Sequence, residues 1–289
     1  MKKVIKQLAR RLIGAFVIFT SKTAAGRFLH DQIVNTAVRR TLKVSHGSLE
    51  LVLPVPNQLC YWRAMTFSAK EPETLQWIDS LPQGALLWDV GANVGLYSVY
   101  AAKHRNCRVW SFEPSVFNLE LLARNAYLNS VSERVCLVPL ALSNALGASR
   151  LHMTSTEWGG AFSTFGDDYG WDDKTLGWDG KTLRQVFEFQ TLGLSMEDAM
   201  QRLGLPQPDY IKMDVDGIEH LILQGGRSVL SRIKGIHIEV DENFREHAEL
   251  CQRLLTEAGL VLLDKRHSDM IENSQSGFQS TLNQTWIRK

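Results

Sequence analysis

The residues with the clearest chemical meaning follow a short apolar run, where one acid and three turn-forming residues stand close together. They are Asp89, Gly91, Asn93 and Gly95. A glycine adopts the positive φ of a tight turn at little steric cost, and the start of a following helix offers free backbone N–H groups to an anionic ligand. Glu113 ends the next apolar run, at the spacing where a carboxylate accepts hydrogen bonds from ribose hydroxyls. This pattern predicts a nucleoside cofactor.

The side chain of Asn93 narrows the choice of cofactor. A dinucleotide-binding turn has a second glycine at this position, because the pyrophosphate must approach the backbone closely. An asparagine there argues against NAD and FAD. It is compatible with a smaller carboxylate and ammonium group, such as the methionine end of S-adenosylmethionine, held by the turn and by Asp89.

A second group of ionisable residues lies on two later apolar runs. Lys212 and Asp214 share one face of a predicted strand, and Asp214 stands at its carboxyl end, where open α/β sheets bind their ligands. Asp214 could hold a sulfonium, orient an acceptor hydroxyl or help to remove its proton, or it could only bond the next turn. His237 and Glu239 share a face of the following strand. Either is a candidate general base, and His237 is also a candidate for a hydrogen-bonded core histidine.

Asp216 and Glu219 allow two further interpretations. The sequence from Asp216 to Glu219 fits a helix N-cap with a reciprocal acid three residues later. The pair Asp214 and Asp216 also has the spacing with which some glycosyltransferases hold a metal and a nucleotide diphosphate. The cysteines have no metal-binding spacing, and we predict no resident metal.

Short apolar strands alternate with helical stretches from residue 84 onward, which predicts an α/β fold with a mostly parallel sheet and helices on both faces. We expect the last two strands to close the sheet as an antiparallel pair. The predicted strands are Leu86–Val90, Arg108–Phe112, Val135–Leu140, Tyr210–Val215, Ile236–Val240, Leu260–Leu263 and Thr281–Ile287.

Residues 151–189 interrupt this alternation with many glycines, and we expect an insertion that covers the acceptor. Tryptophan rings could stack on sugars while carboxylates bind their hydroxyls; alternatively, the tryptophans pack locally. An acidic insertion would repel nucleic acid. The residues concerned are Trp158, Trp171, Trp178, Asp167, Asp168, Asp172, Asp173 and Asp179.

The amino-terminal segment is strongly basic. Residues 1–43 hold ten Lys and Arg against Asp31 alone, so they carry +9 and the rest of the chain carries −8. Their helical spacing with apolar residues predicts either a peripheral contact with an anionic membrane or a helix packed on its own domain. The basic start also resembles a signal peptide, but Lys22 and a weak cleavage patch favour a cytoplasmic protein. We divide the chain into a basic helical region (1–46), a strand and helix cap (47–83) and a core (84–289).

Four ordered motifs together resemble the FkbM family of S-adenosylmethionine-dependent methyltransferases. They are Asp89–Gly95, Phe112–Pro114, Pro139–Ser143 and Lys212–Glu219, with Asp214-Val-Asp-Gly217 in place of the usual DVEG. The resemblance implies a class I methyltransferase fold and a hydroxyl acceptor on a sugar, glycoconjugate or polyketide-like metabolite. It places Gly91, Asn93 and Gly95 around the methionine moiety, Glu113 at the ribose and Ala141, Leu142 and Ser143 at the adenine edge. A metal-dependent glycosyltransferase and a non-catalytic membrane-associated protein are the alternatives, and the oligomeric state is left open.

Overall fold

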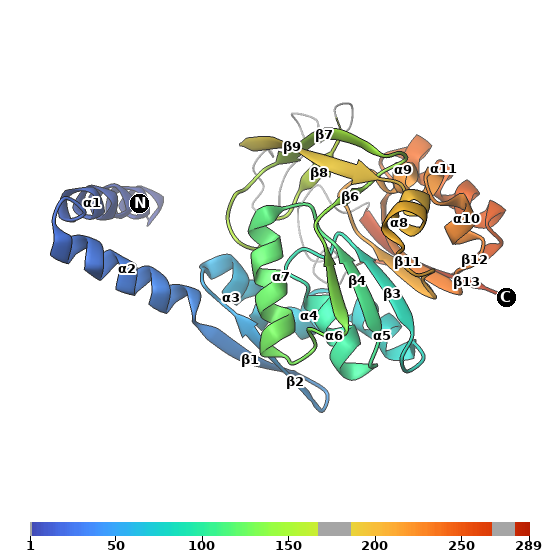
Figure 1. Ribbon diagram of the computed structural model, residues 1–289, viewed down its shortest axis with the longest axis horizontal. Coiled ribbons are helices and arrows are strands. Elements are labelled where there is room, and N and C mark those ends of the chain that lie inside the picture. Colours follow the sequence, from blue (N-terminus) through green and yellow to red (C-terminus); the bar gives the residue numbers. More distant parts are fainter. Residues whose placement is uncertain (1, 167–185, 268–280) are drawn as a thin grey trace.

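The computed structural model describes residues 2–166, 186–267 and 281–289, and its centre is a seven-stranded sheet (Figure 1). All neighbouring strands are parallel except β13, which runs antiparallel to both β11 and β12. This order and the reversed strand confirm the predicted class I methyltransferase sheet. In spatial order the strands are β12 (Leu260–Arg266), β13 (Thr281–Arg288), β11 (Gly235–Asp241), β10 (Tyr210–Met213), β3 (Leu86–Val90), β4 (Arg108–Phe112) and β5 (Val135–Val138).

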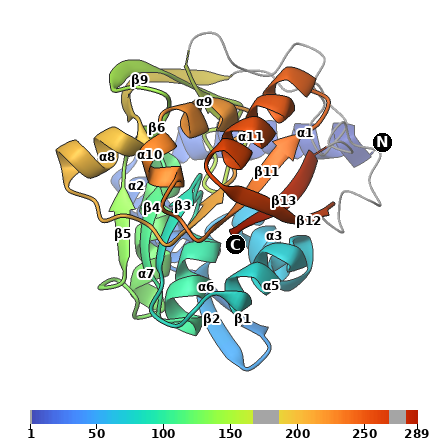
Figure 2. The same ribbon diagram turned by 90° about the vertical axis from the view of Figure 1, so that its right-hand side faces the viewer.

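Helices cover both faces of this sheet, as predicted (Figure 2). The two faces follow from the alternation within β3, where Leu87 packs into one apolar core and Trp88 and Val90 into the other. The Leu87 face carries α3 (Gln58–Met65), α4 (Phe67–Lys70), α5 (Pro72–Ser80), α6 (Leu96–His104) and α7 (Val116–Leu128). The opposite face carries α8 (Met196–Leu203), α9 (Glu219–Gln224), α10 (Arg227–Leu230) and α11 (Arg245–Glu257).

A second, four-stranded sheet corrects the expectation of an irregular insertion at 151–189. Its spatial order is β6 (Ala141–Leu142), β9 (Phe187–Leu194), β7 (Gly147–Met153) and β8 (Ser163–Phe165). The predicted insertion therefore begins within β7 and ends within β9. Gly193 is needed at this pairing, because a Cβ there would lie 2.3 Å from the Phe165 ring. The acidic residues predicted to line an acceptor cover, with Trp171 and Trp178, lie outside the described residues.

The amino-terminal region consists of α1 (Lys2–Thr20) and α2 (Ala24–Val38), followed by a hairpin of β1 (Thr41–His46) and β2 (Leu49–Pro54). The hairpin crosses the predicted boundary between residues 46 and 47, so β1 belongs with the cap and not with the helices. In Figure 1 the two helices, here called the arm (residues 2–38), stand apart from the body. No helix in the described ranges is long and apolar enough to cross a membrane.

Candidate active site

The turn after β3 brings the ends of two strands into direct contact. Gly91 has φ +78°, and a Cβ on it would lie only 1.8 Å from the carbonyl oxygen of Asp214 at the end of β10. The N–H groups of Gly91 and Ala92 both donate to the carbonyl of Phe112, at 3.0 Å. A glycine is therefore required at position 91, because any side chain would push β3 and β10 apart.

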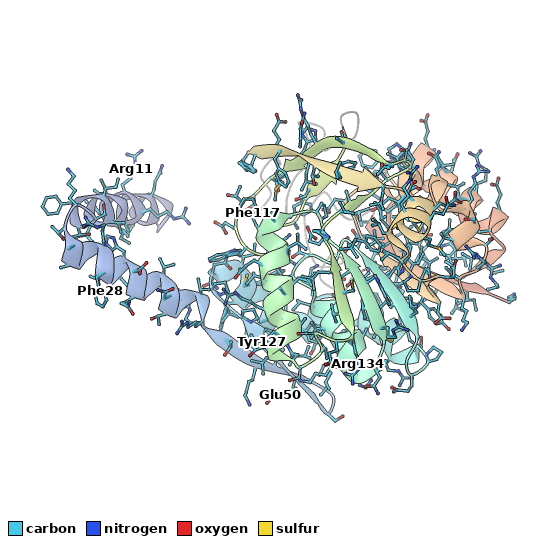
Figure 3. All side chains as sticks on the ribbon, in the orientation of Figure 1. Arg11, Phe28, Glu50, Phe117, Tyr127 and Arg134 are labelled. Carbon is cyan, nitrogen blue, oxygen red and sulfur yellow. The ribbon has the colours of Figure 1, made fainter. Side chains whose placement is uncertain are left out.

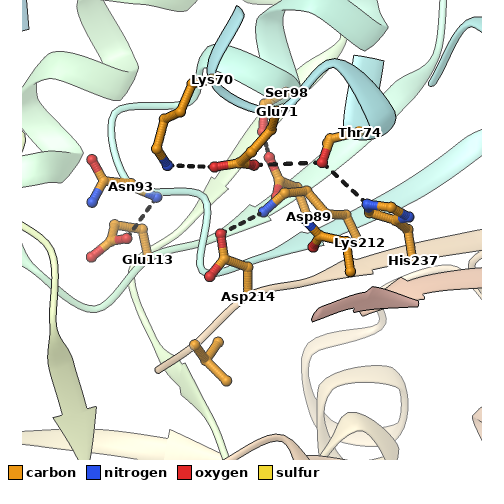
Figure 4. A network of polar contacts seen from close by, with 12 residues as sticks. Lys70, Glu71, Thr74, Asp89, Asn93, Ser98, Glu113, Lys212, Asp214 and His237 are labelled. Atoms are coloured by element: carbon orange, nitrogen blue, oxygen red, sulfur yellow. Dashed lines mark hydrogen bonds and ion pairs between the residues drawn. The ribbon is translucent and has the colours of Figure 1, made fainter. Parts of the chain in front are cut away.

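Glu113 lies at the end of β4 and faces this turn (Figure 4). Its Oε2 accepts a hydrogen bond from the Asn93 backbone N–H, and its Oε1 accepts one from the Ser115 backbone N–H, each at 2.8 Å. Burial raises the pKa of Glu113 to about 7, although both backbone bonds favour the charged form. The side chain of Asn118 also bonds this carboxylate, and a carboxylate has about four acceptor sites, so one is left for a ribose hydroxyl.

A pocket of about 550 Å³, counting the solvent at its mouth, opens beside Glu113. Six of the residues predicted for the site line it, and they come from both sequence clusters. Apolar side chains of Phe112, Leu140 and Leu151 line it as well, which suits the flat face of a nucleobase. The six predicted residues are Gly91, Asn93, Glu113, Ala141, Leu142 and Asp214.

Asn93 lines the pocket, and its side chain also bonds a segment far away in the sequence. Its Nδ2 donates to the carbonyl oxygen of Gly160 at 2.7 Å, and the Asn118 amide donates to the same oxygen at 3.1 Å. Asn118 also accepts from the N–H of Gly159 at 3.1 Å. Residues 158–161, here called the strap, are thereby fixed against the cofactor turn, and Gly160 and Ala161 of the strap line the pocket.

Gly95 and Ser143 are not among the residues that line the pocket, and each has a packing contact instead. A Cβ on Gly95 would lie 2.7 Å from Leu122, so this glycine lets α6 pack closely on α7. The N–H of Ser143 donates to the carbonyl of Leu194 and continues the pairing of β6 with β9.

Lys212 lies between Asp89 of β3 and Asp214, which follows β10, and forms an ion pair with each. Its Nζ lies 3.4 Å from Asp214 and 3.7 Å from Asp89, and Asp89 also accepts a 2.5 Å hydrogen bond from Ser98. Burial acts against the charge of Lys212, but the neighbouring carboxylates hold its pKa above the ordinary value. Burial raises the pKa of Asp89, while Lys212 and Ser98 oppose this shift. Asp89 therefore lies behind the pocket and supports it, and Asp214 reaches the pocket wall.

Two residues of the cap extend this network and were not predicted. Glu71 is buried and forms an ion pair with Lys70, and the hydroxyl of Thr74 donates to it at 3.4 Å (Figure 4). Although burial raises the pKa of Glu71, the charges of Lys70 and Lys212 outweigh that effect and lower it to about 2. The only sequence signal was their place before Pro72, which marks a helix start and not a site.

His237 lies in the core beside the site. Its ring bonds Thr74 at 3.1 Å and Thr285 at 3.0 Å, and it stacks on Trp77 with ring centroids 5.2 Å apart. Burial lowers the pKa of His237 to about 4, so it is neutral at pH 7. His237 is not among the residues lining the pocket, and these contacts match the core histidine that the sequence allowed.

Glu239 is half-buried at the end of β11 and is also absent from the pocket lining. Burial, followed by the charges of Asp214, Glu71 and Asp216, raises the pKa of Glu239 well above its ordinary value. A neutral Glu239 can donate a hydrogen bond but is a poor general base at pH 7.

The turn after β10 corrects the predicted capping box. The N-cap of α9 is Ile218, not Asp216, and it makes no side-chain cap. Asp216 instead accepts a 3.2 Å hydrogen bond from Ser163 of β8, while Glu219 accepts from the N–H groups of Val215 at 3.3 Å and Gly217 at 3.2 Å. Burial, then the charges of Asp214 and Glu219, raise the pKa of Asp216 to about 8.

Across residues 2–166, 186–267 and 281–289, no three His, Cys, Asp or Glu side chains gather into a group that could hold a metal ion. The DxD pair at Asp214 and Asp216 is therefore not part of a larger ligand set within these ranges.

Comparison with known proteins agrees with this geometry. The sequence profile of the methyltransferase FkbM domain matches residues 89–262, more than half of the chain. "Methyltransferase sdnD" of Sordaria araneosa is 34% identical over 71 residues, which cover 24% of this chain and 27% of that protein. The matched part thus spans about a quarter of the length of this curated relative.

Solved methyltransferases show a distant likeness over three quarters or more of the chain. Precorrin-6y C5,15-methyltransferase from Geobacter metallireducens GS-15 is 14% identical with a TM-score of 0.41, covering 75% of this chain and 86% of that one. TYW2 from P. horikoshii in complex with MeSAdo is 14% identical with a TM-score of 0.43, covering 86% and 69%. The tRNA m1G37 methyltransferase of M. jannaschii is 14% identical with a TM-score of 0.43, covering 87% and 58%.

The sheet order, the glycine turn and Glu113 define a class I, S-adenosylmethionine-dependent methyltransferase. The chain belongs to the FkbM methyltransferase domain family. The pocket fits an adenosine with its apolar wall, the carboxylate of Glu113 and the close backbone approach at Gly91. S-adenosylmethionine, when bound, supplies a methyl group on a positively charged sulfur.

Proposed function

We propose that the protein is an O-methyltransferase that acts on a hydroxyl of a sugar or glycoconjugate. One observation carries the proposal: Asp214 lines the same pocket as Glu113, and its backbone packs against the cofactor turn at Gly91. A carboxylate at that place stands next to the methionine end of the cofactor site. It can accept the hydrogen bond of an acceptor hydroxyl and aim its oxygen at the methyl group.

Asp214 is the residue to which we assign the acceptor proton. The buried Lys212 side chain, 4% exposed, forms an ion pair with the Asp214 carboxylate. The Asp214 side chain is about one-third exposed and lines the pocket. Asp216, which lines the pocket and has a raised pKa, suits hydrogen-bond donation to acceptor oxygens. A set of donors and acceptors around one carboxylate is suited to a polyhydroxylated acceptor. We assign His237 a positioning role through Thr74, which also contacts Glu71.

Two other acceptor or reaction classes are less well supported. Outside the amino-terminal segment the chain carries a net charge of −8, which disfavours a nucleic acid as the acceptor. Metal-dependent glycosyl transfer would need both Asp214 and Asp216 turned toward one ion, but Asp216 is bonded to the backbone of Ser163. We place the methyl-transfer reaction in the cytoplasm.

The test uses S-adenosylmethionine with an isotopically labelled methyl group and a glycolipid and polysaccharide extract. Mass spectrometry of the products should reveal a labelled methyl ether on a sugar hydroxyl. Asp214→Asn should lower the rate about 100-fold or more, since it removes the proton acceptor. Asp209→Asn is the matched control, because Asp209 binds the Leu86 N–H at the amino ends of β10 and β3, away from the pocket. A labelled nitrogen or sulfur, or full activity in Asp214→Asn, would contradict the proposal.

A further inference from the structure

The arm exposes a large apolar surface. On α1, five side chains spaced three or four residues apart are between 57% and 72% exposed. Phe28 and Ile33 of α2 are 67% and 57% exposed. Figure 3 labels Arg11 and Phe28 on the arm, clear of the body. The five side chains of α1 are Ile5, Leu8, Leu12, Phe16 and Phe19, and Ile13 and Ile18 of the same helix are also exposed, at 62% and 67%. The alternative in which this helix packs its apolar face on its own domain is therefore wrong.

The bend between the two helices has a defined geometry. Thr23 caps α2 by accepting from the N–H of Gly26 at 3.0 Å, and its hydroxyl donates to the carbonyl of Thr20 at 3.0 Å. Gly26 is buried at this bend. A glycine is needed there, because a Cβ would lie 2.0 Å from the carbonyl oxygen of Thr20. The Thr20 hydroxyl also bonds the His30 ring at 2.9 Å. Two helices are thus held together with their apolar residues exposed.

The charge of the arm indicates what covers this surface. Residues 1–43 carry +9, and at 100° per residue Arg10 lies on the side of α1 opposite Leu8 and Leu12. An amphipathic helix with a basic polar side and large apolar residues is the form that lies in the plane of an anionic bilayer surface. The arm itself holds seven Lys and Arg against Asp31, so a second copy would bring another +6 against it, which opposes pairing. No described helix is long and apolar enough to span a membrane.

We propose that α1 and α2 form an interfacial anchor that docks the protein on a lipid surface rich in anionic headgroups. The apolar side chains enter the boundary between headgroups and acyl chains, and the arginines and lysines contact the headgroups. This anchor is independent of the methyl-transfer reaction and rests on the exposed arm alone.

The test is co-sedimentation of the full chain with vesicles of phosphatidylcholine, with and without 30% phosphatidylglycerol. Phe16→Ser with Phe19→Ser should lower the partition coefficient on anionic vesicles about tenfold or more. Arg10→Glu with Arg11→Glu should lower it by about tenfold or more as well, and binding should weaken with salt. Tyr127→Ser is the matched control, because Tyr127 is 77% exposed on α7 of the body. All variants should keep wild-type affinity for S-adenosylhomocysteine, which separates this proposal from the enzymatic one.

Equal binding to neutral and anionic vesicles, or no loss in either arm variant, would overturn the proposal. So would analytical ultracentrifugation that finds a lipid-independent dimer in the wild type and a monomer in Phe16→Ser with Phe19→Ser. In that case the apolar surface of the arm would be an interface between copies of this chain.

Discussion

Replacing Glu113 with glutamine tests the cofactor site most sharply. The carboxylate now accepts two backbone N–H bonds, from Asn93 and Ser115, each at 2.8 Å. In Glu113→Gln one of these donors faces an NH₂ group, and the ribose loses a charged acceptor. Because a hydrogen bond to a charged group contributes about 1.5–3 kcal/mol, we expect a loss of about 2 kcal/mol, or roughly 30-fold in affinity.

The same substitution has a signature in pH. The pKa of Glu113 rises from an ordinary 4.5 to about 7 in the folded protein, so the folded state holds a proton that the unfolded chain has released. Stability from this group is therefore present at low pH and falls as pH rises from 4.5 to 7, by about 3 kcal/mol in total. Glu113→Gln should remove this part of the pH dependence.

Isothermal titration with S-adenosylhomocysteine at pH 8 and pH 6 measures the effect on binding. The gap between wild type and Glu113→Gln should be widest at pH 8, where Glu113 is ionised, and narrow at pH 6. Asp209→Asn, which also replaces an acceptor of a backbone N–H, should bind like the wild type. Affinities within threefold at pH 8, or an equal loss in Asp209→Asn, would refute the assignment of Glu113.

Three further substitutions follow from the same geometry. Gly91→Ala should abolish S-adenosylhomocysteine binding and cost about 1–3 kcal/mol in urea unfolding, since its Cβ has no room at φ +78°; wild-type binding would contradict this. Lys212→Met should cost about 3–5 kcal/mol in the same assay, because Asp89 keeps a buried charge without its cation; a cost under 1 kcal/mol would refute the role of this ion pair. Asn118→Ala should speed amide exchange at Gly159, whose N–H donates to Asn118, since the strap loses two hydrogen bonds; unchanged protection there would mean that Asn118 does not hold the strap.

The elements of the fold that could be predicted are those indicated by a local sequence pattern. The strands Leu86–Val90 and Arg108–Phe112 have the predicted bounds, because each is a short apolar run between turn signals. The second sheet escaped prediction. β7 and β9 are largely exposed and contain several polar residues, and they pair with each other across the long segment between them. Such pairing depends on distant partners, not on local periodicity.

The residues of the candidate site also differ in whether a local sequence pattern could identify them. Glu113 and Asp214 could be found because strand ends in a parallel sheet meet at one edge. Lys70 and Glu71 could not, because they reach that edge from a helical cap outside the alternating strands and helices. The sequence places Asn93 around the methionine moiety but does not predict that its side chain bonds the strap, because the position of the strap depends on tertiary packing.

The central claim is that the junction of β3 with α6 holds the cofactor with its sulfur toward Asp214. A crystal structure of the protein with S-adenosylhomocysteine measures this directly. We predict ribose hydroxyls within hydrogen-bond distance of Glu113, the base among Phe112, Leu140 and Leu142, and the sulfur on the side of Asp214. A ligand bound elsewhere, or bound here with its sulfur turned away from Asp214, would contradict the account.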